Sequence, residues 1–336
     1  MPTTWGQRQQ YGEFKIVGAA EGHPKLLGEG SFGKTFEAVR EDSVAGNVIE
    51  ERVALKVLNP ELLGSASKRL QFVHERTALT RLKHANLIHS IKCGEDDGEV
   101  YFAMELCMGG DLTRLVKRFG AIPERVAALI GLQAAAGLRE MHRREMVHRD
   151  IKPQNIMIFE QLPQNCALDE LTLMLEENES LCRIVDFGLV GTILNAQNPS
   201  SHAAHQKFVG SMMYASPEQI LERKNIDGRA DVYALGMTLW YLVQGRGPLL
   251  DARGDELRHA TEAESRHLSE KPHDADLPNI LSQEFRGILA QMVAKNPEDR
   301  FGSARDLESA LERYVDRSAR AKSMGSVLMQ SRQPLR

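Results

Sequence analysis

An acid, a cation and an amide lie within one short stretch near the middle of the chain, His148-Arg149-Asp150-Ile151-Lys152-Pro153-Gln154-Asn155. A carboxylate such as Asp150 can accept the proton of a hydroxyl, an ammonium such as Lys152 can neutralise a phosphate, and Asn155 can hold a metal ion. The stretch follows a long helical pattern and precedes the apolar, strand-like run Ile156-Met157-Ile158-Phe159. These features indicate a loop that activates a hydroxyl beside a phosphate; the alternative is a surface loop that is merely charged.

A glycine-rich stretch near the N-terminus, Gly28-Glu29-Gly30-Ser31-Phe32-Gly33, lies between two strand-like runs, Lys25–Leu27 and Thr35–Val39. Glycines let a backbone lie close to phosphate groups and donate its N–H groups to them. Dinucleotide-binding folds share this spacing, but they place the glycines at a turn from a strand into a helix. Here a strand follows, which favours a phosphate-covering hairpin.

A lysine lies inside an apolar strand-like run, Val53-Ala54-Leu55-Lys56. A buried ammonium is costly unless it is paired. The helical pattern that begins at Lys68 offers Glu75, on the same face as Phe72 and Leu79. The alternative is a solvated lysine on an edge strand.

The order of these motifs resembles that of the protein kinase family, whose catalytic loop reads H-R-D-x-x-x-x-N. Asp186-Phe187-Gly188 after Ile184-Val185, and Tyr214-Ala215-Ser216-Pro217-Glu218 further on, resemble that family's D-F-G and A-P-E motifs, with Ser216 in place of Ala. A lysine two residues after the catalytic acid is typical of members specific for Ser and Thr. The resemblance covers about residues 25 to 315.

The resemblance implies a role for each site residue. Asp150 would orient a Ser or Thr hydroxyl and accept its proton, while Lys56 and Lys152 offset charge on the transferred phosphoryl group. Mg²⁺ would be held by Asn155 and Asp186. Met104 would be the gatekeeper, Glu105 and Cys107 would bond the adenine through their backbone, and Asp111 would reach the ribose. The implied ATP-binding residues are Gly28, Glu29, Gly30, Ser31, Phe32, Gly33, Thr35, Ala54, Lys56, Glu75, Met104, Glu105, Cys107, Asp111, Asn155 and Asp186.

The resemblance also implies structural or regulatory roles for four further residues. Glu218 would form an ion pair with Arg300, and Asp231 would brace the catalytic loop by accepting backbone N–H bonds. Arg149 would bind a phosphate added to the activation segment, at Ser200, Ser201 or Thr192. The alternative for Arg149 is a brace that acts through hydrogen bonds alone.

The elements that position these residues divide the chain. Strand-like runs dominate before Glu105, and helical patterns dominate after Gly110, at about 123–144, 229–243, 283–295 and 303–314. A polar loop is predicted at 41–51, and strands near 87–91 and 100–106 with a turn at 94–98 between them. We expect an α+β, two-lobed protein kinase fold: a small antiparallel N-lobe sheet with one key helix, and a larger helical C-lobe.

The predicted domain organisation is an N-terminal extension over residues 1–20, a kinase domain over 21–315 and a flexible tail over 316–336. The N-lobe would cover about 21–105 and the C-lobe about 110–315. Residues 160–182 are longer than a hairpin needs, and they are acidic and half apolar. This insert either docks a partner or is a tolerated surface insertion.

Composition limits the remaining classes. Of the 336 residues 42% are hydrophobic and 26% charged, and a net charge of -4 argues against nucleic-acid binding through bulk positive charge. The cysteines form no C-x-x-C pair, residues 1–10 lack a signal peptide's apolar core, and the apolar run 126–138 is too short to span a bilayer. We therefore expect a cytoplasmic protein with reduced thiols and no membrane segment in this chain.

The resulting expectation is a Ser/Thr protein kinase, closest to the bacterial eukaryotic-like group, that uses ATP and Mg²⁺ and acts on proteins. Activation would follow autophosphorylation, for which a homodimer acting in trans is one arrangement. Two other classes stay open: a pseudokinase scaffold, which typically loses the lysine or one of the two acids, and a small-molecule phosphotransferase, which generally lacks the activation segment.

Overall fold

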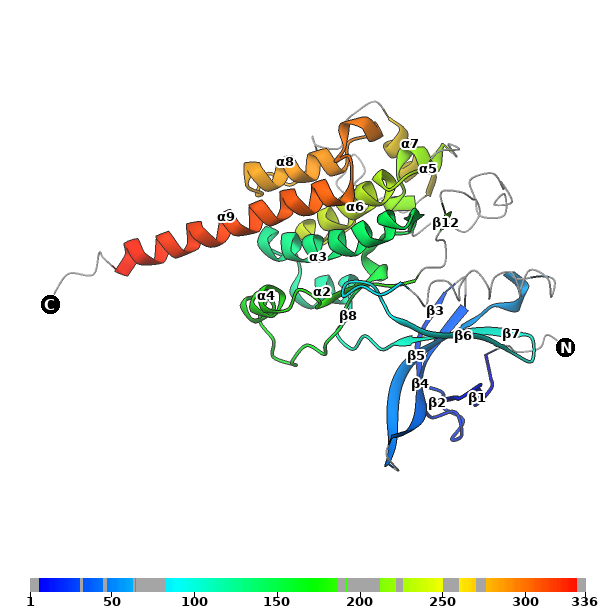
Figure 1. Cartoon of the computed structure of the whole chain (residues 1–336). Coiled ribbons are helices and arrows are strands. Elements are labelled where there is room, and N and C mark those ends of the chain that lie inside the picture. Colours follow the sequence, from blue (N-terminus) through cyan, green and yellow to red (C-terminus); the bar gives the residue numbers. More distant parts are fainter. Residues whose placement is uncertain are drawn as a thin grey trace. The chain divides into compact units, whose positions relative to one another are not determined.

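The computed structural model describes residues 6–30, 33–44, 47–62, 64, 82–186, 191–192, 212–221, 226–249, 260–269 and 276–330. The chain forms two compact units, Met1–Met108 and Gly109–Arg336 (Figure 1). The first is built on an antiparallel sheet and the second mainly on helices. This is the predicted α+β architecture, and the division falls between the expected ends of the two lobes. The predicted key helix, with Glu75, lies outside the described residues.

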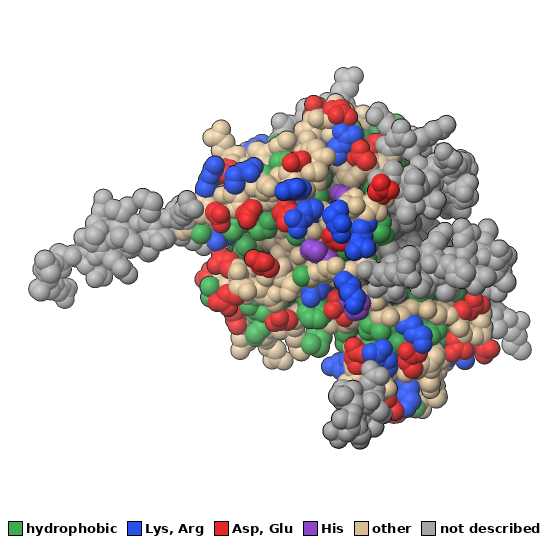
Figure 2. Space-filling model, in the orientation of Figure 1, with side chains coloured by type: hydrophobic (Ala, Val, Ile, Leu, Met, Phe, Trp, Pro, Cys, Tyr) green, Lys and Arg blue, Asp and Glu red, His purple; other side chains and the backbone are tan. Residues whose placement is uncertain are grey.

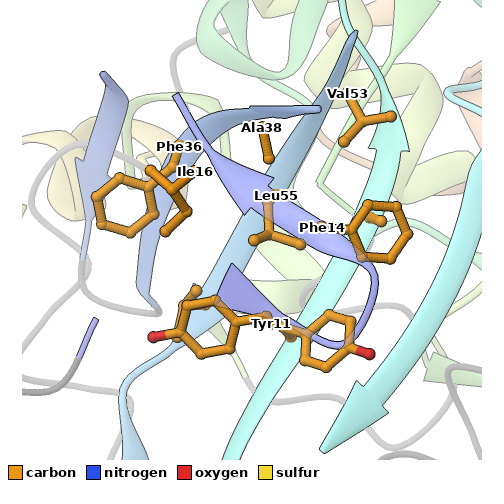
Figure 3. Close-up of a cluster of buried hydrophobic side chains, with 10 residues drawn as sticks. Tyr11, Phe14, Ile16, Phe36, Ala38, Val53 and Leu55 are labelled. Carbon is orange, nitrogen blue, oxygen red and sulfur yellow. The ribbon is translucent and has the colours of Figure 1, made fainter. Parts of the chain in front are cut away.

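The N-terminal unit is a seven-stranded sheet in the order β1-β2-β4-β5-β7-β6, with β3 also paired to β4. The strands are β1 (Gln10–Tyr11), β2 (Phe14–Ile16), β3 (Leu26–Gly30), β4 (Gly33–Val44), β5 (Asn47–Leu58), β6 (Ser90–Asp96) and β7 (Glu99–Glu105). Alternate residues of β4, β5 and β7 turn to one face, because side chains of a strand alternate between faces. There they form the core cluster drawn in Figure 3, which includes Phe36, Val53, Leu55 and Tyr101.

Residues 10–16 belong to this sheet, although the predicted domain organisation places residues 1–20 in an N-terminal extension. Tyr11 and Phe14 are fully buried, and their rings lie 5.8 and 6.1 Å from that of Tyr101. The backbone N–H of Gly12 donates to Asp96 Oδ2 at 3.0 Å. The apolar residues that fill this part of the core are few and spaced among polar ones, so they give a weak sequence signal.

One loop prediction in the N-terminal unit is wrong, and a predicted turn is longer than the turn in the structure. The polar stretch 41–51 is mostly paired backbone, since β4 and β5 continue to the pair Val44↔Asn47. Cross-strand hydrogen bonds join backbone groups, so polar side chains do not prevent this pairing. The predicted turn 94–98 is limited to Asp97 and Gly98, whose φ angles of 48° and 80° suit a two-residue hairpin. Strand β6 spans Ser90–Asp96, so it begins and ends later than the strand predicted near 87–91.

The C-terminal unit contains the helices α2 (Leu112–Phe119), α3 (Glu124–Arg143), α4 (Leu168–Glu177), α5 (Pro217–Ile220), α6 (Arg229–Gln244), α7 (Ala260–Leu268), α8 (Gln283–Met292) and α9 (Ala304–Gln330). Its short strands are β8 (Gly110–Asp111), β9 (Met146–Val147), β10 (Ile156–Ile158), β11 (Cys182–Ile184) and β12 (Gly191–Thr192). Within the described part of this unit, 3-10 turns cover Pro153–Asn155, Met212–Tyr214 and Pro297–Asp299. Helix α3 packs against α6 and α9 (Figure 1).

Helix α6 lies at the centre of the C-terminal unit. Its residues from Ala230 to Trp240 are all buried, and Gly245 ends it with a φ of 72°. A helix that is apolar all round is a core helix. The predicted helices 123–144 and 229–243 are confirmed by α3 and α6. Helix α8 stops at Met292, three residues early, and α2, α4 and α7 have no predicted counterpart.

The predicted boundary at residue 315, where a flexible tail was expected to begin, falls inside α9, which continues to Gln330. Among the described helices, none is both long and apolar enough to cross a membrane. On the face shown in Figure 2, acidic and basic side chains are interspersed over the described surface. This mixture agrees with the small net charge.

Candidate active site

The loop between β9 and β10 brings together the acid, cation and amide that the sequence singles out. Lys152 Nζ lies 2.8 Å from Asp150 Oδ2, and Asn155 Nδ2 donates to the same oxygen at 3.0 Å. Asn155 Nδ2 also donates to the backbone carbonyl of Asp150 at 2.8 Å. The Asp150 side chain is 9% exposed. Two donors therefore hold one carboxylate oxygen, as a group that orients a substrate hydroxyl would require.

Asp231, on the buried helix α6, holds the start of this loop. Its Oδ2 accepts from the backbone N–H of His148 and its Oδ1 from that of Arg149, both at 2.8 Å. His142 Nε2 lies 2.8 Å from Oδ2. Burial by itself would raise the pKa of Asp231. The hydrogen bond with His142, the electrostatic effect of His142 and His148 and the backbone N–H of His148 outweigh burial and lower that pKa. The predicted brace is thus confirmed, and it is an ionised carboxylate.

Two residues beside these groups have an unusual backbone. Arg149 and Asp186 have φ angles of 67° and 63°, a region that residues other than glycine seldom occupy. Such conformations cost about 1–3 kcal/mol and cluster at functional sites, where the surroundings enforce them. The backbone N–H of Val185 donates to the carbonyl of Asn155 at 2.9 Å, and β10 pairs with β11. Asn155 and Asp186 therefore flank neighbouring strand ends.

The donor set of Asn155 and Asp186 fits a magnesium ion. The Asn155 amide nitrogen is committed to Asp150, which leaves the amide oxygen Oδ1 as the acceptor. Asp186 adds a carboxylate, and Mg²⁺ prefers hard oxygen ligands and few protein groups. Both residues belong to the C-terminal unit and would hold the ion there.

A buried ion pair anchors helix α5. Arg300 Nη1 and Nη2 donate to Glu218 Oε1 and Oε2 at 2.7 and 2.8 Å, and the two residues are 4% and 5% exposed. The guanidinium also donates to backbone carbonyls, including that of Ala294 at 2.7 Å, and lies over the Tyr233 ring. The predicted Glu218–Arg300 pair is confirmed, and its remaining hydrogen-bond donors are satisfied as a buried pair requires.

In the N-terminal unit, Lys56 lies on a central strand. It pairs with Thr35 of β4 on one side and Phe102 of β7 on the other, and Ala54 pairs with Met104. The alternative of an edge-strand lysine is therefore wrong. The lysine side chain is half-buried.

The glycine-rich stretch joins two antiparallel strands. Gly30 of β3 pairs with Gly33 of β4, which excludes the strand-to-helix turn of a dinucleotide-binding fold. A Cβ on Gly33 would lie 2.2 Å from the Val57 carbonyl oxygen, so packing of the sheet requires that glycine. A Cβ on Gly28 or Gly30 would meet no atom within 4 Å. Packing therefore does not require these two, and they leave the backbone open to a ligand. Ser31 and Phe32 lie outside the described residues.

Two of the residues that the resemblance assigns to adenine and ribose binding, Glu105 and Asp111, form hydrogen bonds within the chain. Glu105 ends β7, and its Oε1 accepts from the backbone N–H of His89 at 2.8 Å. Cys107 is half-buried. Asp111 caps helix α2, since its Oδ1 accepts from the N–H groups of Thr113 and Arg114 at 2.8 and 3.0 Å. The sequence carries the usual signal for this cap, an Asp directly before the first apolar residue of a helix, but no cap is predicted there.

A sheet with a central lysine and an open glycine strand pair, together with a helical unit that carries an acid–cation–amide loop, defines a phosphotransferase with a kinase fold. The family model described as "Protein kinase domain" matches residues 23–312, and the chain therefore belongs to the protein kinase family.

Known proteins similar to this chain agree with that assignment. It is 28% identical over 305 residues to a probable serine/threonine-protein kinase of Clostridium perfringens, covering 89% of this chain and 39% of that protein. It is 30% identical over 300 residues to the serine/threonine-protein kinase pkn3 of Myxococcus xanthus, covering 88% and 50%. The crystal structure of the Mycobacterium tuberculosis PknI kinase domain (C20A mutant) matches with a TM-score of 0.60 and 25% identity, covering 90% of this chain and 96% of that one. The chain thus spans half or less of the length of these two curated relatives.

Proposed function

We propose that this chain transfers the γ-phosphoryl group of ATP to Ser and Thr hydroxyls of proteins. The observation that carries the proposal is the Asp150–Lys152–Asn155 cluster, held on the buried brace Asp231. Asp150 would orient the substrate hydroxyl and accept its proton. Lys152 would offset charge on the phosphoryl group during its transfer. Little covalent help is needed in such a transfer, so positioning and electrostatics supply most of the rate.

Nucleotide-binding roles follow for the residues that the resemblance singles out. We assign the phosphates to the backbone of 28–33 and to Lys56 with Glu75, the adenine to Thr35, Ala54, Met104, Glu105 and Cys107, and the ribose to Asp111. Mg²⁺ bound by Asn155 and Asp186 would neutralise phosphate charge. The strand pairing around Lys56 and the open flank of Gly28 and Gly30 support this assignment.

The two other classes are less well supported. A pseudokinase scaffold would have lost Lys56, Asp150 or Asp186, and all three are present. A small-molecule phosphotransferase would have no use for the anchored segment that ends at the Glu218–Arg300 pair.

Labelled ATP and a generic protein substrate test this function directly. Transfer to protein that requires Mg²⁺ is the expected result. Asp150→Asn should leave the melting temperature and nucleotide binding unchanged and lower kcat by roughly 10²- to 10⁴-fold, because a general base and orienter is lost. Asp169→Asn is a matched control, since it removes an exposed carboxylate from α4. Full activity in Asp150→Asn would exclude the role given to Asp150.

We also propose that autophosphorylation of the activation segment raises activity. Arg149, a cation of the catalytic loop, has a buried Nε with no hydrogen-bond partner among the described residues. A phosphate brings about -1.5 to -2 charges and strong acceptors to such a site. The candidate hydroxyls are Ser200 and Ser201, with Thr192 next. Residues 193–211 lie outside the described residues.

Mass spectrometry after incubation with ATP would locate the phosphate. Phosphatase-treated protein should be slower than ATP-treated protein, and the Thr192→Ala, Ser200→Ala, Ser201→Ala triple variant should stay slow. Equal rates in all three samples would contradict the switch.

We further propose a cytoplasmic location, where four free thiols would persist. We also propose a homodimer that phosphorylates in trans. Wild-type protein mixed with the Asp150→Asn variant should phosphorylate the variant chain, and absence of phosphate on that chain would contradict trans action.

A further inference from the structure

Gln219, on the short helix α5, links that helix to the catalytic loop. Its Oε1 accepts from the backbone N–H and from the hydroxyl of Ser216, at 3.1 and 3.0 Å. Its Nε2 donates to the backbone carbonyl of Arg149 at 2.8 Å. The two ends of one amide therefore serve two segments that are distant in sequence.

These partners fix the orientation of the amide. The Ser216 N–H can only donate and the Arg149 carbonyl can only accept, so the oxygen must face Ser216 and the nitrogen must face Arg149. A carboxylate of the same size could satisfy the first partner but would oppose the second. The hydrogen bond that Gln219 donates to the Arg149 carbonyl is therefore not needed for capping helix α5.

The Arg149–Asp150 peptide is held at both of its polar atoms. Gln219 holds the carbonyl of Arg149, and the ring of His148, through Nδ1, accepts from the N–H of Asp150 at 3.3 Å. On its other side, the N–H of Arg149 donates to Asp231. These contacts enforce the left-handed φ of Arg149, which would relax without them. These contacts fix the plane of the Arg149–Asp150 peptide, which is bonded to the Cα atom that carries the Asp150 side chain.

The other end of this link is rigid. Glu218, the neighbour of Gln219, is tied to Arg300 in the buried pair described above. A side chain on an anchored helix can hold a loop in place, whereas one on a mobile loop cannot.

We propose that Gln219 is a positioning residue, which sets the orientation of Asp150 by holding the Arg149 carbonyl against the anchored helix α5. The inference rests on the proposed kinase function. Misplacing a catalytic group by about 1 Å can lower a rate by roughly a hundredfold. Loss of this link should therefore lower kcat while leaving ATP binding intact.

Two variants separate positioning from capping. Gln219→Glu keeps an oxygen for Ser216, as in the common capping box, but places a second oxygen against the Arg149 carbonyl. It should keep the melting temperature and the KM for ATP and lower kcat by about ten- to a hundredfold. Ser216→Ala is the reciprocal control: it weakens the cap, retains the link to Arg149, and should keep kcat.

Amide hydrogen exchange gives a readout that does not depend on activity. Exchange at residues 148–152 should accelerate in Gln219→Glu and stay at the wild-type rate in Ser216→Ala. Wild-type kcat and wild-type exchange in Gln219→Glu would overturn the inference, as would a loss of kcat that merely follows a lower melting temperature. If the wild-type protein transfers no phosphoryl group, the proposed function fails instead, and exchange still tests the link.

Discussion

His267, on α7, is a titratable side chain sealed inside the C-terminal unit. It is fully buried, and its Nδ1 lies 2.6 Å from the hydroxyl of Tyr233 on α6. Burial lowers the pKa of His267 to about 3, and the nearby charges of Lys295 and Arg266 act in the same direction. The imidazole is therefore neutral near pH 7, where it joins α7 to α6.

This neutral histidine predicts a loss of stability in mild acid. Between pH 6.5 and about 3 the unfolded chain binds a proton at His267 and the folded protein does not, so stability falls as pH falls. The slope from this one group is about 1.4 kcal/mol per pH unit. Urea unfolding at pH 5, 6 and 7 should show a shallower decline for His267→Asn, which retains an acceptor for Tyr233. Equal slopes would mean that His267 becomes protonated in the folded state.

Lys295 also makes the free energy of unfolding depend on pH, but over a different pH range from His267. Burial lowers the pKa of Lys295 from 10.5 to about 8, and its Nζ donates to the carbonyls of Arg266 and Ser269. Stability from this group changes only between those two values, rising with pH. Measurements at pH 7 and below therefore isolate His267 from Lys295.

At the scale of elements, the insert over residues 160–182 is packed onto the C-terminal unit. It contains α4, whose Leu171 and Leu175 are buried, and Gln133 of α3 donates to the carbonyl of Leu175 at 3.2 Å. Arg125 of α3 forms an ion pair with Glu176 at 2.6 Å. Leu173, on the outer side, is 56% exposed. The apolar residues that suggest partner docking are thus mostly used within the chain, which favours a structural insertion.

Truncating the buried leucines of α4 tests that reading. Leu171→Ala and Leu175→Ala should each lower the free energy of unfolding by about 2–5 kcal/mol, through lost burial and a residual cavity. Leu173→Ala removes the same atoms from an exposed position and should change it by less than about 0.5 kcal/mol. If the three variants are equally stable in urea titrations, α4 is a loosely attached surface insertion.

At the scale of the whole chain, the last helix extends beyond the matched family domain, which ends at residue 312. Arg125 Nη1 donates to the carbonyl of Val315 at 2.7 Å and to the hydroxyl of Ser318. The same arginine pairs with Glu176 of α4, so one side chain joins α3, the insert and α9. Contacts within the C-terminal unit therefore reach at least to Ser318, three residues past the predicted boundary.

Two truncations test where these contacts end. Removal of residues 316–336 deletes the Ser318 contact, worth about 1 kcal/mol for one hydrogen bond, and should lower the melting temperature by about 2–4 °C. Removal of residues 320–336 keeps the contact and should leave the melting temperature unchanged. Both proteins should retain wild-type specific activity. A drop in activity with either would show that the terminal helix supports catalysis.

The sequence by itself determined which residues of the proposed catalytic loop lie together. Asp150, Lys152 and Asn155 are close in the chain, so a short loop had to bring them together, and a strand after the glycines favoured a hairpin. The long helices α3 and α6 were also predictable, because their apolar content and their Pro and Gly boundaries are local features.

The tertiary structure alone decided the contacts that hold this loop in place. Gln219 and Arg149 are 70 residues apart, and no spacing rule shows that one amide donates to the other's carbonyl. The burial of Tyr11 and Phe14 and the packing of α4 were likewise invisible, because both depend on surfaces supplied by distant segments. Hydrogen-bond direction and burial are properties of three-dimensional neighbours, whereas a motif records only neighbours along the chain.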